Sequence, residues 1–508
     1  MRTPGVTLRL AALLLCALAL PAEAGDLQDA RRLADAGDYA PALVLYDRVV
    51  AATPDDSDLA IERARVLGYA DRHAEAIAAY EQLVARFPAR RPDVVGYWAW
   101  QELWSGDAEA AVPLFREALS HRPGDAGLRS GLAQSLLWSG HEREAAQVYA
   151  SLLPTTDAGL ALQAARAYYW AGFPEKAMPL LAGASLPAAQ YLRDYRVARE
   201  RRHYLSGSFD WSDDADDLRI LAATAAGGWR FGAGDTAELS VRSAWFDGPD
   251  TSEPGNPHYS LDGQEMLLAW SGRLGDVDSP QGVAWPLLAV GMRDYDGWSE
   301  LAWRARARWA PADGSSFTAY GGNGVVETVG AIRNEIGYTE GSLSGETRLT
   351  QRWLLAGGVS QIAFDRGNDR TQGTLRLEYL LVPAWRLRVG ADTVYFTDSD
   401  PVGPDQPDLG YWSPERYSEE RLYASLSADR GAWSFDGRAS AGYYQERDGW
   451  GNDNGGPTFA IEGVAAYDFS PSLRLKLYAG GAQSGFSFGG GGSGYHRTYA
   501  GVALTGWF

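Results

Sequence analysis

Arginine occupies every second position in one short stretch of the chain, at Arg304, Arg306 and Arg308. The intervening positions carry Trp303, Ala305 and Ala307 and are apolar. Successive side chains of a β-strand point to opposite faces, so this pattern predicts one charged face and one apolar face. An arginine facing lipid at the middle of a bilayer costs about 2–4 kcal/mol. We therefore expect the arginines to face water inside a closed barrel. A soluble sandwich would reverse the arrangement, with the apolar face in a dry core.

The same alternation recurs in at least three other segments, 371–381, 385–397 and 459–467. Each segment places charged residues opposite a row of Leu, Val, Ile, Ala or Tyr. The predicted lumen-lining residues are Arg304, Arg306, Arg308, Arg376, Glu378, Arg386, Arg388 and Glu462. Because both signs of charge occur, these side chains could also bond to one another across the pore. The pattern therefore predicts a polar lumen and leaves open whether the lumen conducts.

Residues suited to catalysis form no recognisable motif. The six histidines are scattered, and no two have the spacing of zinc ligands. No nucleophile motif or phosphate-binding loop is present. Residues 448–455 resemble a calcium loop in composition but lack its final glutamate. We expect no enzyme activity, no cofactor and no metal site.

The region from 204 to 508 reads as about 16 antiparallel strands, with 14 or 18 possible if one hairpin is miscounted. The eighth strand is expected at 333–349. Connections after even-numbered strands are mostly short, whereas many of those after odd-numbered strands are long and polar. Transmembrane barrels have short turns on the periplasmic side and longer outer loops. This places the start of the first strand in the periplasm.

The last strand, 494–508, alternates apolar residues and ends on Phe508. It resembles the C-terminal signature of bacterial outer-membrane barrels. That resemblance implies an outer-membrane location, contact with outer-membrane lipid and insertion by the barrel assembly machinery.

The N-terminus and the overall charge limit the remaining possibilities. Residues 1–24 have the charged, apolar and small-residue parts of a secretory signal peptide, and its removal would take away Cys16, the only cysteine. The mature chain would then contain no disulfide. The chain has 46 basic and 65 acidic residues, a net charge of −19, which argues against nucleic acid as a partner.

A helical repeat occupies 25–187. Turn positions Gly37, Asp71, Gly106, Gly140 and Gly172 are followed five residues later by alanine and nine residues later by an aromatic residue or leucine. This pattern resembles the tetratricopeptide repeat, a stack of antiparallel helix pairs that binds partners. Aromatic residues of the first helices include Tyr97, Trp98, Trp100, Trp104, Trp138 and Trp170. They can either fill the core between repeats or form a docking surface for a protein or a sugar chain.

The complete prediction is an α + β chain of two domains, an α-solenoid followed by a transmembrane β-barrel. The expected boundaries are a signal peptide at 1–24, repeats at 25–187, a helical linker at 188–203 and the barrel at 204–508. The linker carries Arg196, Arg199, Arg201 and Arg202. These arginines fit either an ordinary solvated helix end or contact with anionic lipid.

One motif points to a function. Residues 410–417 read Gly-Tyr-Trp-Ser-Pro-Glu-Arg-Tyr at the end of the longest expected outer loop. They resemble a segment of the porins that export poly-N-acetylglucosamine and cellulose, which also join periplasmic repeats to a 16-stranded barrel. The resemblance implies polymer contact at Tyr411, Trp412 and Tyr417. The alternative is that these rings only pack the start of the loop.

We therefore expect an outer-membrane porin that exports an exopolysaccharide, with its repeats in the periplasm. The repeats would dock the polymer or the periplasmic or inner-membrane proteins that synthesise and modify it. Two alternatives are a protein translocator of the surface-lipoprotein type, which usually has 14 strands, and a surface receptor or adhesin.

Overall fold

A computed structural model describes residues 25–404, 406–483 and 495–508. The expected signal peptide and the glycine-rich tip at 489–492 lie outside the described residues. The chain divides into two compact units, residues 1–156 and residues 157–508.

The helices follow the predicted repeats. Residues 25–35 are helical. The helices of the first unit are α2 (Tyr39–Ala52), α3 (Ser57–Tyr69), α4 (His73–Arg86), η1 (Pro88–Arg90), α5 (Arg91–Ser105), α6 (Ala108–His121), α7 (Ala126–Trp138) and α8 (Glu142–Ala150). Those before the barrel in the second unit are α9 (Ala158–Trp170), α10 (Pro174–Leu180), α11 (Pro187–Tyr191), the π-helix η2 (Leu192–Val197) and α12 (Ala198–Arg201).

The repeat positions predicted to be small are buried at the helix crossings. Fully buried alanines of the first helices are Ala30, Ala64, Ala99, Ala133 and Ala165, and those of the second helices are Ala42, Ala76, Ala111, Ala145 and Ala177. The large residue nine positions after each turn is also buried, as in Tyr80, Phe115 and Tyr149. Small residues allow the helices to approach closely, and the aromatic ring fills the space between successive pairs.

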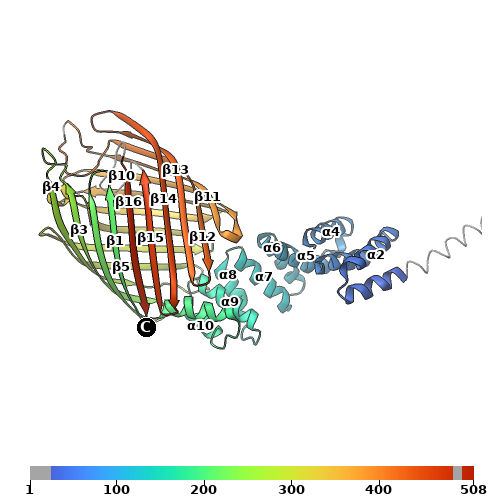
Figure 1. The fold of residues 1–508 in the computed structure, drawn as a ribbon. Coiled ribbons are helices and arrows are strands. Elements are labelled where there is room, and N and C mark those ends of the chain that lie inside the picture. The colour runs from blue at the N-terminus through green and yellow to red at the C-terminus, as the bar shows by residue number, and fades with distance from the viewer. Residues whose placement is uncertain (1–24, 405, 484–494) are drawn as a thin grey trace, which may run out of the picture. The chain divides into compact units, whose positions relative to one another are not determined.

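The second unit contains a closed antiparallel barrel of 16 strands, as predicted (Figure 1). The strands are β1 (Tyr204–Asp214), β2 (Arg219–Phe231), β3 (Asp235–Pro249), β4 (His258–Ser271), β5 (Val283–Tyr295), β6 (Trp298–Ala312), β7 (Ser315–Val325), β8 (Gly337–Arg348), β9 (Trp353–Phe364), β10 (Asp369–Val382), β11 (Leu387–Asp398), β12 (Arg416–Arg430), β13 (Trp433–Arg447), β14 (Asp453–Ser470), β15 (Leu473–Gln483) and β16 (Arg497–Trp507). β1 pairs with β16 from Tyr204↔Trp507 to Asp214↔Arg497. Closure leaves no edge strand unpaired.

The outer surface of the barrel is apolar. Leu268, Leu343, Val359, Leu422 and Ile461 each expose more than half of their surface. They occupy the strand positions that alternate with inward polar residues, as in Glu462 next to Ile461. A soluble protein would bury such a surface, whereas a membrane barrel presents it to lipid. The apolar strand positions are thus the exposed ones.

The two ends of the barrel differ. The turn end carries the start of β1, the C-terminus and the short connections between even- and odd-numbered strands (Figure 1). The loop end carries the longest connection, 399–415. The prediction of a strand at 333–349 was wrong at its start, because a short helix, α13 (Val329–Arg333), precedes β8. Thr328 caps this helix by accepting a hydrogen bond from the Ala331 N–H at 3.2 Å. The capped helix occupies the start of the predicted strand, so β8 begins only at Gly337.

Helices α10 and α12 are bonded to the turn end. Arg199 of α12 is buried, donates to the carbonyls of Pro471 and Ser470 at 2.9 and 2.8 Å, and pairs with Asp468 at 2.7 Å. Its guanidinium also lies 4.4 Å from the ring centre of Trp507. Arg199 is thus neither solvated nor directed to lipid, which were the two alternatives for the linker arginines.

Candidate functional site in the barrel lumen

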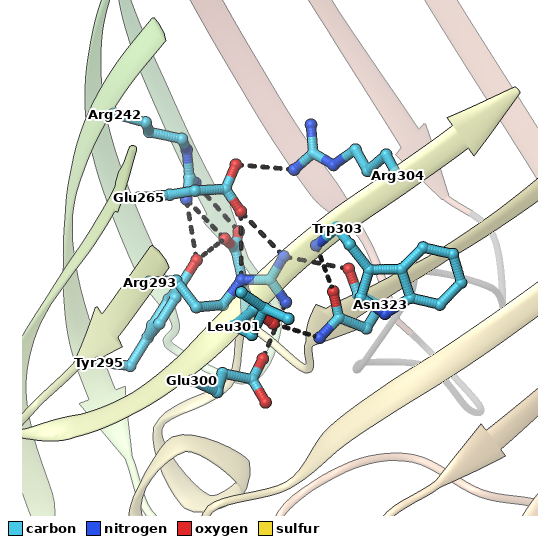
Figure 2. Close-up of polar contacts among 10 residues, drawn as sticks. Arg242, Glu265, Arg293, Tyr295, Glu300, Leu301, Trp303, Arg304 and Asn323 are labelled. Atoms are coloured by element: carbon cyan, nitrogen blue, oxygen red, sulfur yellow. Dashed lines mark hydrogen bonds and ion pairs between the residues drawn. The ribbon is translucent and has the colours of Figure 1, made fainter. Parts of the chain in front are cut away.

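A network of charged side chains covers one wall of the lumen. Arg293 on β5 is almost fully buried and pairs with Glu265 on β4 at 3.0 Å and with Glu300 on β6 at 2.8 Å. The second carboxylate oxygen of Glu265 accepts from Arg304 at 2.7 Å (Figure 2). Alternate residues of three neighbouring strands therefore meet on the inner face. Charges removed from water are stable only when paired in this way.

The Asn323 side chain on β7 forms hydrogen bonds with the backbone of β6 in this wall. Its side-chain oxygen accepts from the Trp303 N–H at 2.8 Å, and its side-chain amide donates to the Leu301 carbonyl at 2.6 Å (Figure 2). The side chain thus replaces a backbone partner for β6. The Asn323 carbonyl is left to accept a hydrogen bond from Arg293 at 3.1 Å. A cavity of about 640 Å³ lies beside this network.

A second network covers strands β10 to β13. Asp392 accepts hydrogen bonds from Arg421, at 2.7 Å, and from Arg438. Glu378 pairs with Arg388 at 3.3 Å and accepts from the Tyr423 hydroxyl at 2.9 Å. A cavity of about 610 Å³ borders this network. Both walls therefore offer fixed donors and acceptors to a hydrated ligand.

The eight predicted lumen residues have different environments in the structure. Arg304, Arg308, Glu378, Arg388 and Glu462 are bonded to Glu265, Glu346, Arg388, Glu378 and Tyr499, respectively. Arg386 lies in the turn before β11, in a left-handed conformation, and pairs with Asp429 at 3.3 Å. Among the described residues no carboxylate pairs with Arg306 or Arg376, and each of these arginines lines a cavity.

The connection between β7 and β8, residues 326–336, folds inward and forms a plug at the loop end. On one side Val329 and Ile332 pack against inward residues of β2 to β5, including Phe246 and Tyr295. On the other side Val326, Ala331 and Ile336 pack against Ile362 and Phe364 of β9 and against Tyr411. Strands β2 and β9 lie on nearly opposite sides of the closed barrel. The plug therefore crosses the lumen.

Ion pairs attach the plug to the wall and to a neighbouring loop. Glu327 accepts two hydrogen bonds from Arg242 of β3, at 2.7 and 3.1 Å, and one from the Tyr295 hydroxyl at 3.0 Å. Arg333 pairs with the buried Asp250 at 2.7 Å. Its guanidinium lies 3.6 Å from the ring centre of Tyr259. These contacts give the plug one defined position.

The octet at 410–417 covers the plug. Gly410 has a positive φ of 83°, and a Cβ there would clash with the backbone of Gly330 in α13. The Tyr411 ring is buried and stacks on Phe364 at 4.9 Å, and its hydroxyl oxygen accepts a hydrogen bond from the Asn368 side-chain amide at 3.1 Å. Burial raises the pKa of Tyr411 above its usual range.

The other two predicted polymer-contact residues also pack against protein. Tyr417 is fully buried and stacks on Phe396 at 5.2 Å. Trp412 is partly buried and meets the rings of Phe396 and Tyr417 edge to face. The faces of Tyr411 and Tyr417 are covered, so the packing alternative describes their contacts in this structure.

Sequence reasoning missed most of the wall residues that form the networks. Arg242, Glu265 and Arg293 lie on strands whose alternation could have identified them as inward. Glu327 gave no such signal, because it lies in a connection and its partner is 85 positions away. Trp285 on β5 was also missed.

Two further findings concern metal binding and membrane-spanning helices. Within the described residues, no group of three or more His, Cys, Asp or Glu side chains is arranged to hold a metal ion. Among these residues, no helix has both the length and the hydropathy required to cross a membrane.

Comparison with known proteins identifies the helical part. Residues 103–158 match the family model described as tetratricopeptide repeat. The match lies within a helical region that is tetratricopeptide-like over residues 25–201. A search of curated proteins gave no significant match.

Several solved structures match part of this chain. One described as "Bacterial polysaccharide outer membrane secretin" is 11% identical, with a TM-score of 0.46, and the match covers 61% of this chain and 99% of that chain. A structure described as MamA MSR-1 and one of YrrB, described as a TPR protein, are 20% and 18% identical, with TM-scores of 0.29. Each of these matches covers 34% of this chain, and 95% and 88% of the other chain, respectively. YrrB is described as having an unusual peptide-binding site.

Proposed function

We propose that this protein is an outer-membrane conduit that exports an exopolysaccharide through its barrel. The observation that carries the proposal is the polar, charged lumen inside a barrel with an apolar outer surface. A polysaccharide is rich in hydroxyl groups, and the paired arginines and carboxylates of both walls can exchange hydrogen bonds with such a chain. The proposal assigns no catalytic role to any residue.

The repeats act on the periplasmic side in this proposal. They dock the polymer, or the periplasmic or inner-membrane proteins that make and modify it. Tetratricopeptide arrays bind partners along a surface assembled from successive repeats. The octet at 410–417 supports the choice of a polysaccharide through its resemblance to exopolysaccharide porins. The count of 16 strands also supports this choice over the lipoprotein translocator, whose barrel usually has 14.

Secretion in a Gram-negative host tests the proposal. Removing the protein should abolish polymer at the cell surface and leave it in the periplasm, and the wild-type chain should restore secretion. If removing the protein instead abolished a surface lipoprotein and left the amount of surface polymer unchanged, the protein would be a protein translocator.

Planar bilayers test the conduit separately from its cargo. Replacing Arg304, Arg306 and Arg308 together by Glu should change single-channel conductance or ion selectivity, because it reverses three charges on one wall. Arg63→Glu, in α3 of the repeat array, is the matched control. A record identical to the wild type for the triple variant would remove these arginines from the pore wall.

A further inference from the structure

Four aromatic rings occupy one equivalent position of successive repeats. Tyr69, Trp104, Trp138 and Trp170 each lie two residues before the turn that ends the first helix of a repeat. Their side chains are 51%, 48%, 49% and 53% exposed, respectively. The first three belong to unit 1–156 and the fourth to unit 157–508. We call the three residues of unit 1–156, Tyr69, Trp104 and Trp138, the ring series.

The ring series is not needed to fill the repeat core. Each of the corresponding repeats already has a buried large side chain in its second helix, at Tyr80, Phe115 and Tyr149. Single exposed apolar residues are common on protein surfaces and need no explanation. Within unit 1–156, three half-exposed aromatic rings at one repeat position form a regular pattern, which a ligand with a repeating structure can match.

Trp170 also lies in a built cavity. This cavity, of about 830 Å³, is bordered by α9, α12 and the turn end of the barrel. Trp285 lines it from β5, with Arg306 from β6 and Asp235 from β3. Trp285 packs beside Gly172, which follows Trp170 in the turn. The cavity thus combines two indole rings, an arginine without a carboxylate partner among the described residues, and a carboxylate.

This combination suits a saccharide. A pyranose ring has an apolar C–H face that packs on a flat aromatic ring, while its hydroxyl groups at the rim reach charged and polar side chains. Peptides are usually held by an exposed sheet edge or by a continuous apolar groove. Residues 25–156 contain no strand, and the ring series consists of separate rings.

We propose that the ring series binds a polysaccharide along the repeats, and that Trp170, Trp285 and Arg306 form a saccharide subsite at the turn end of the barrel. The inference rests on the proposed function for its ligand class. It adds the residues that hold the polymer before it enters the lumen.

The test is calorimetric titration of the full-length protein in detergent micelles. The probes are oligosaccharides of N-acetylglucosamine, their partly deacetylated forms and cello-oligosaccharides. The double variant Trp104→Ala/Trp138→Ala should weaken binding about thirtyfold, which corresponds to about 1 kcal/mol for each of the two lost stacking contacts. Trp170→Ala should also weaken it. Val44→Ala removes an exposed apolar side chain outside the series and should change nothing.

Trp285→Ala removes a packing contact with the turn at Gly172, so Trp285→Leu serves as its second variant. Thermal unfolding monitors folding in every case. Binding that is unchanged in the ring variants, or no binding of any probe by the wild type, would overturn the inference. Tight binding of an unstructured peptide, abolished by the same substitutions, would assign the rings to peptides instead.

Measuring polymer secretion by the ring variants distinguishes a failure of this inference from a failure of the proposed function. Normal polymer export together with normal oligosaccharide binding in the ring variants would reject the ring series and keep the conduit. Oligosaccharide binding that depends on the rings, in a protein that exports no polymer, would keep the ring series and reject the conduit.

Discussion

Arg242 on β3 and Glu327 in the plug form an ion pair inside the lumen, with two hydrogen bonds of 2.7 and 3.1 Å. The pair joins the barrel wall to a connection that crosses the loop end. In the proposed function, a polymer leaving the barrel has to pass this plug. The strength of the pair therefore bears on how easily the loop end opens.

Replacing Glu327 by Gln should raise the open probability of the channel. The substitution keeps the shape of the side chain but leaves Arg242 without its charged partner, which weakens the attachment of the plug. Single-channel recording in planar bilayers measures this effect. Glu420→Gln is the matched control, since Glu420 is exposed on β12. Equal open probabilities in Glu327→Gln and the wild type would show that the pair does not hold the plug.

Gly410→Ala should displace the plug by a steric route. The backbone at Gly410 has a φ of 83°, which strains any residue with a Cβ, and the new Cβ would clash with Gly330. We expect higher conductance and faster proteolysis of the 399–415 loop. Gly431→Ala at the turn end has similar backbone strain, with a φ of 62°, but open space around it. The Gly431→Ala variant should therefore carry backbone strain without higher conductance or faster proteolysis of the 399–415 loop.

Asp398→Asn should destabilise the loop end. The carboxylate of Asp398 accepts two hydrogen bonds of 2.8 Å from Arg370, and both side chains are almost completely buried. Breaking such a pair leaves a buried charge uncompensated and costs about 3–5 kcal/mol. Urea unfolding of the barrel in micelles measures this cost. The double variant Arg370→Met/Asp398→Asn should lose less stability than Asp398→Asn alone. A single variant as stable as the wild type would contradict the expectation.

Arg199→Ala should loosen the attachment of α12 to the turn end. The side chain donates to two carbonyls of the β14–β15 connection and pairs with Asp468. We expect the segment 187–203 to become sensitive to protease while the barrel remains folded. Arg201→Ala, on the same helix and exposed, is the control. Equal protease sensitivity in the two variants would show that Arg199 is not the anchor.

The contact between α10 and the barrel should depend on pH. A hydrogen bond from Lys176 lowers the pKa of Asp276 in the β4–β5 connection below its usual value. Since the folded-state pKa is depressed, the stabilisation is present above the ordinary aspartate pKa and is lost as the pH falls through the lowered value. Hydrogen exchange of α10 should therefore accelerate in acid. The same acceleration in Asp276→Asn would rule out this carboxylate as the cause.

The local pattern of the sequence determined the elements of this fold. Alternation along each strand separated outward residues such as Ile461 from inward ones such as Glu462, because one face must meet lipid and the other water. The 34-residue spacing placed Ala111 and Phe115 in the repeat core, because each helix pair must cover the next. Both patterns depend on neighbours close in sequence, and they predicted 16 strands.

Only the tertiary structure decided which polar groups bond to each other and which rings are free. The partner of Glu327 is 85 positions away, and the octet at 410–417 packs on a helix, α13, that alternation did not reveal. Both Tyr411 and Trp104 were candidate binding residues in the sequence, but Tyr411 is buried and Trp104 is half-exposed. The physical reason is that burial inside a closed barrel depends on what crosses its lumen, and barrel closure brings together residues from distant strands.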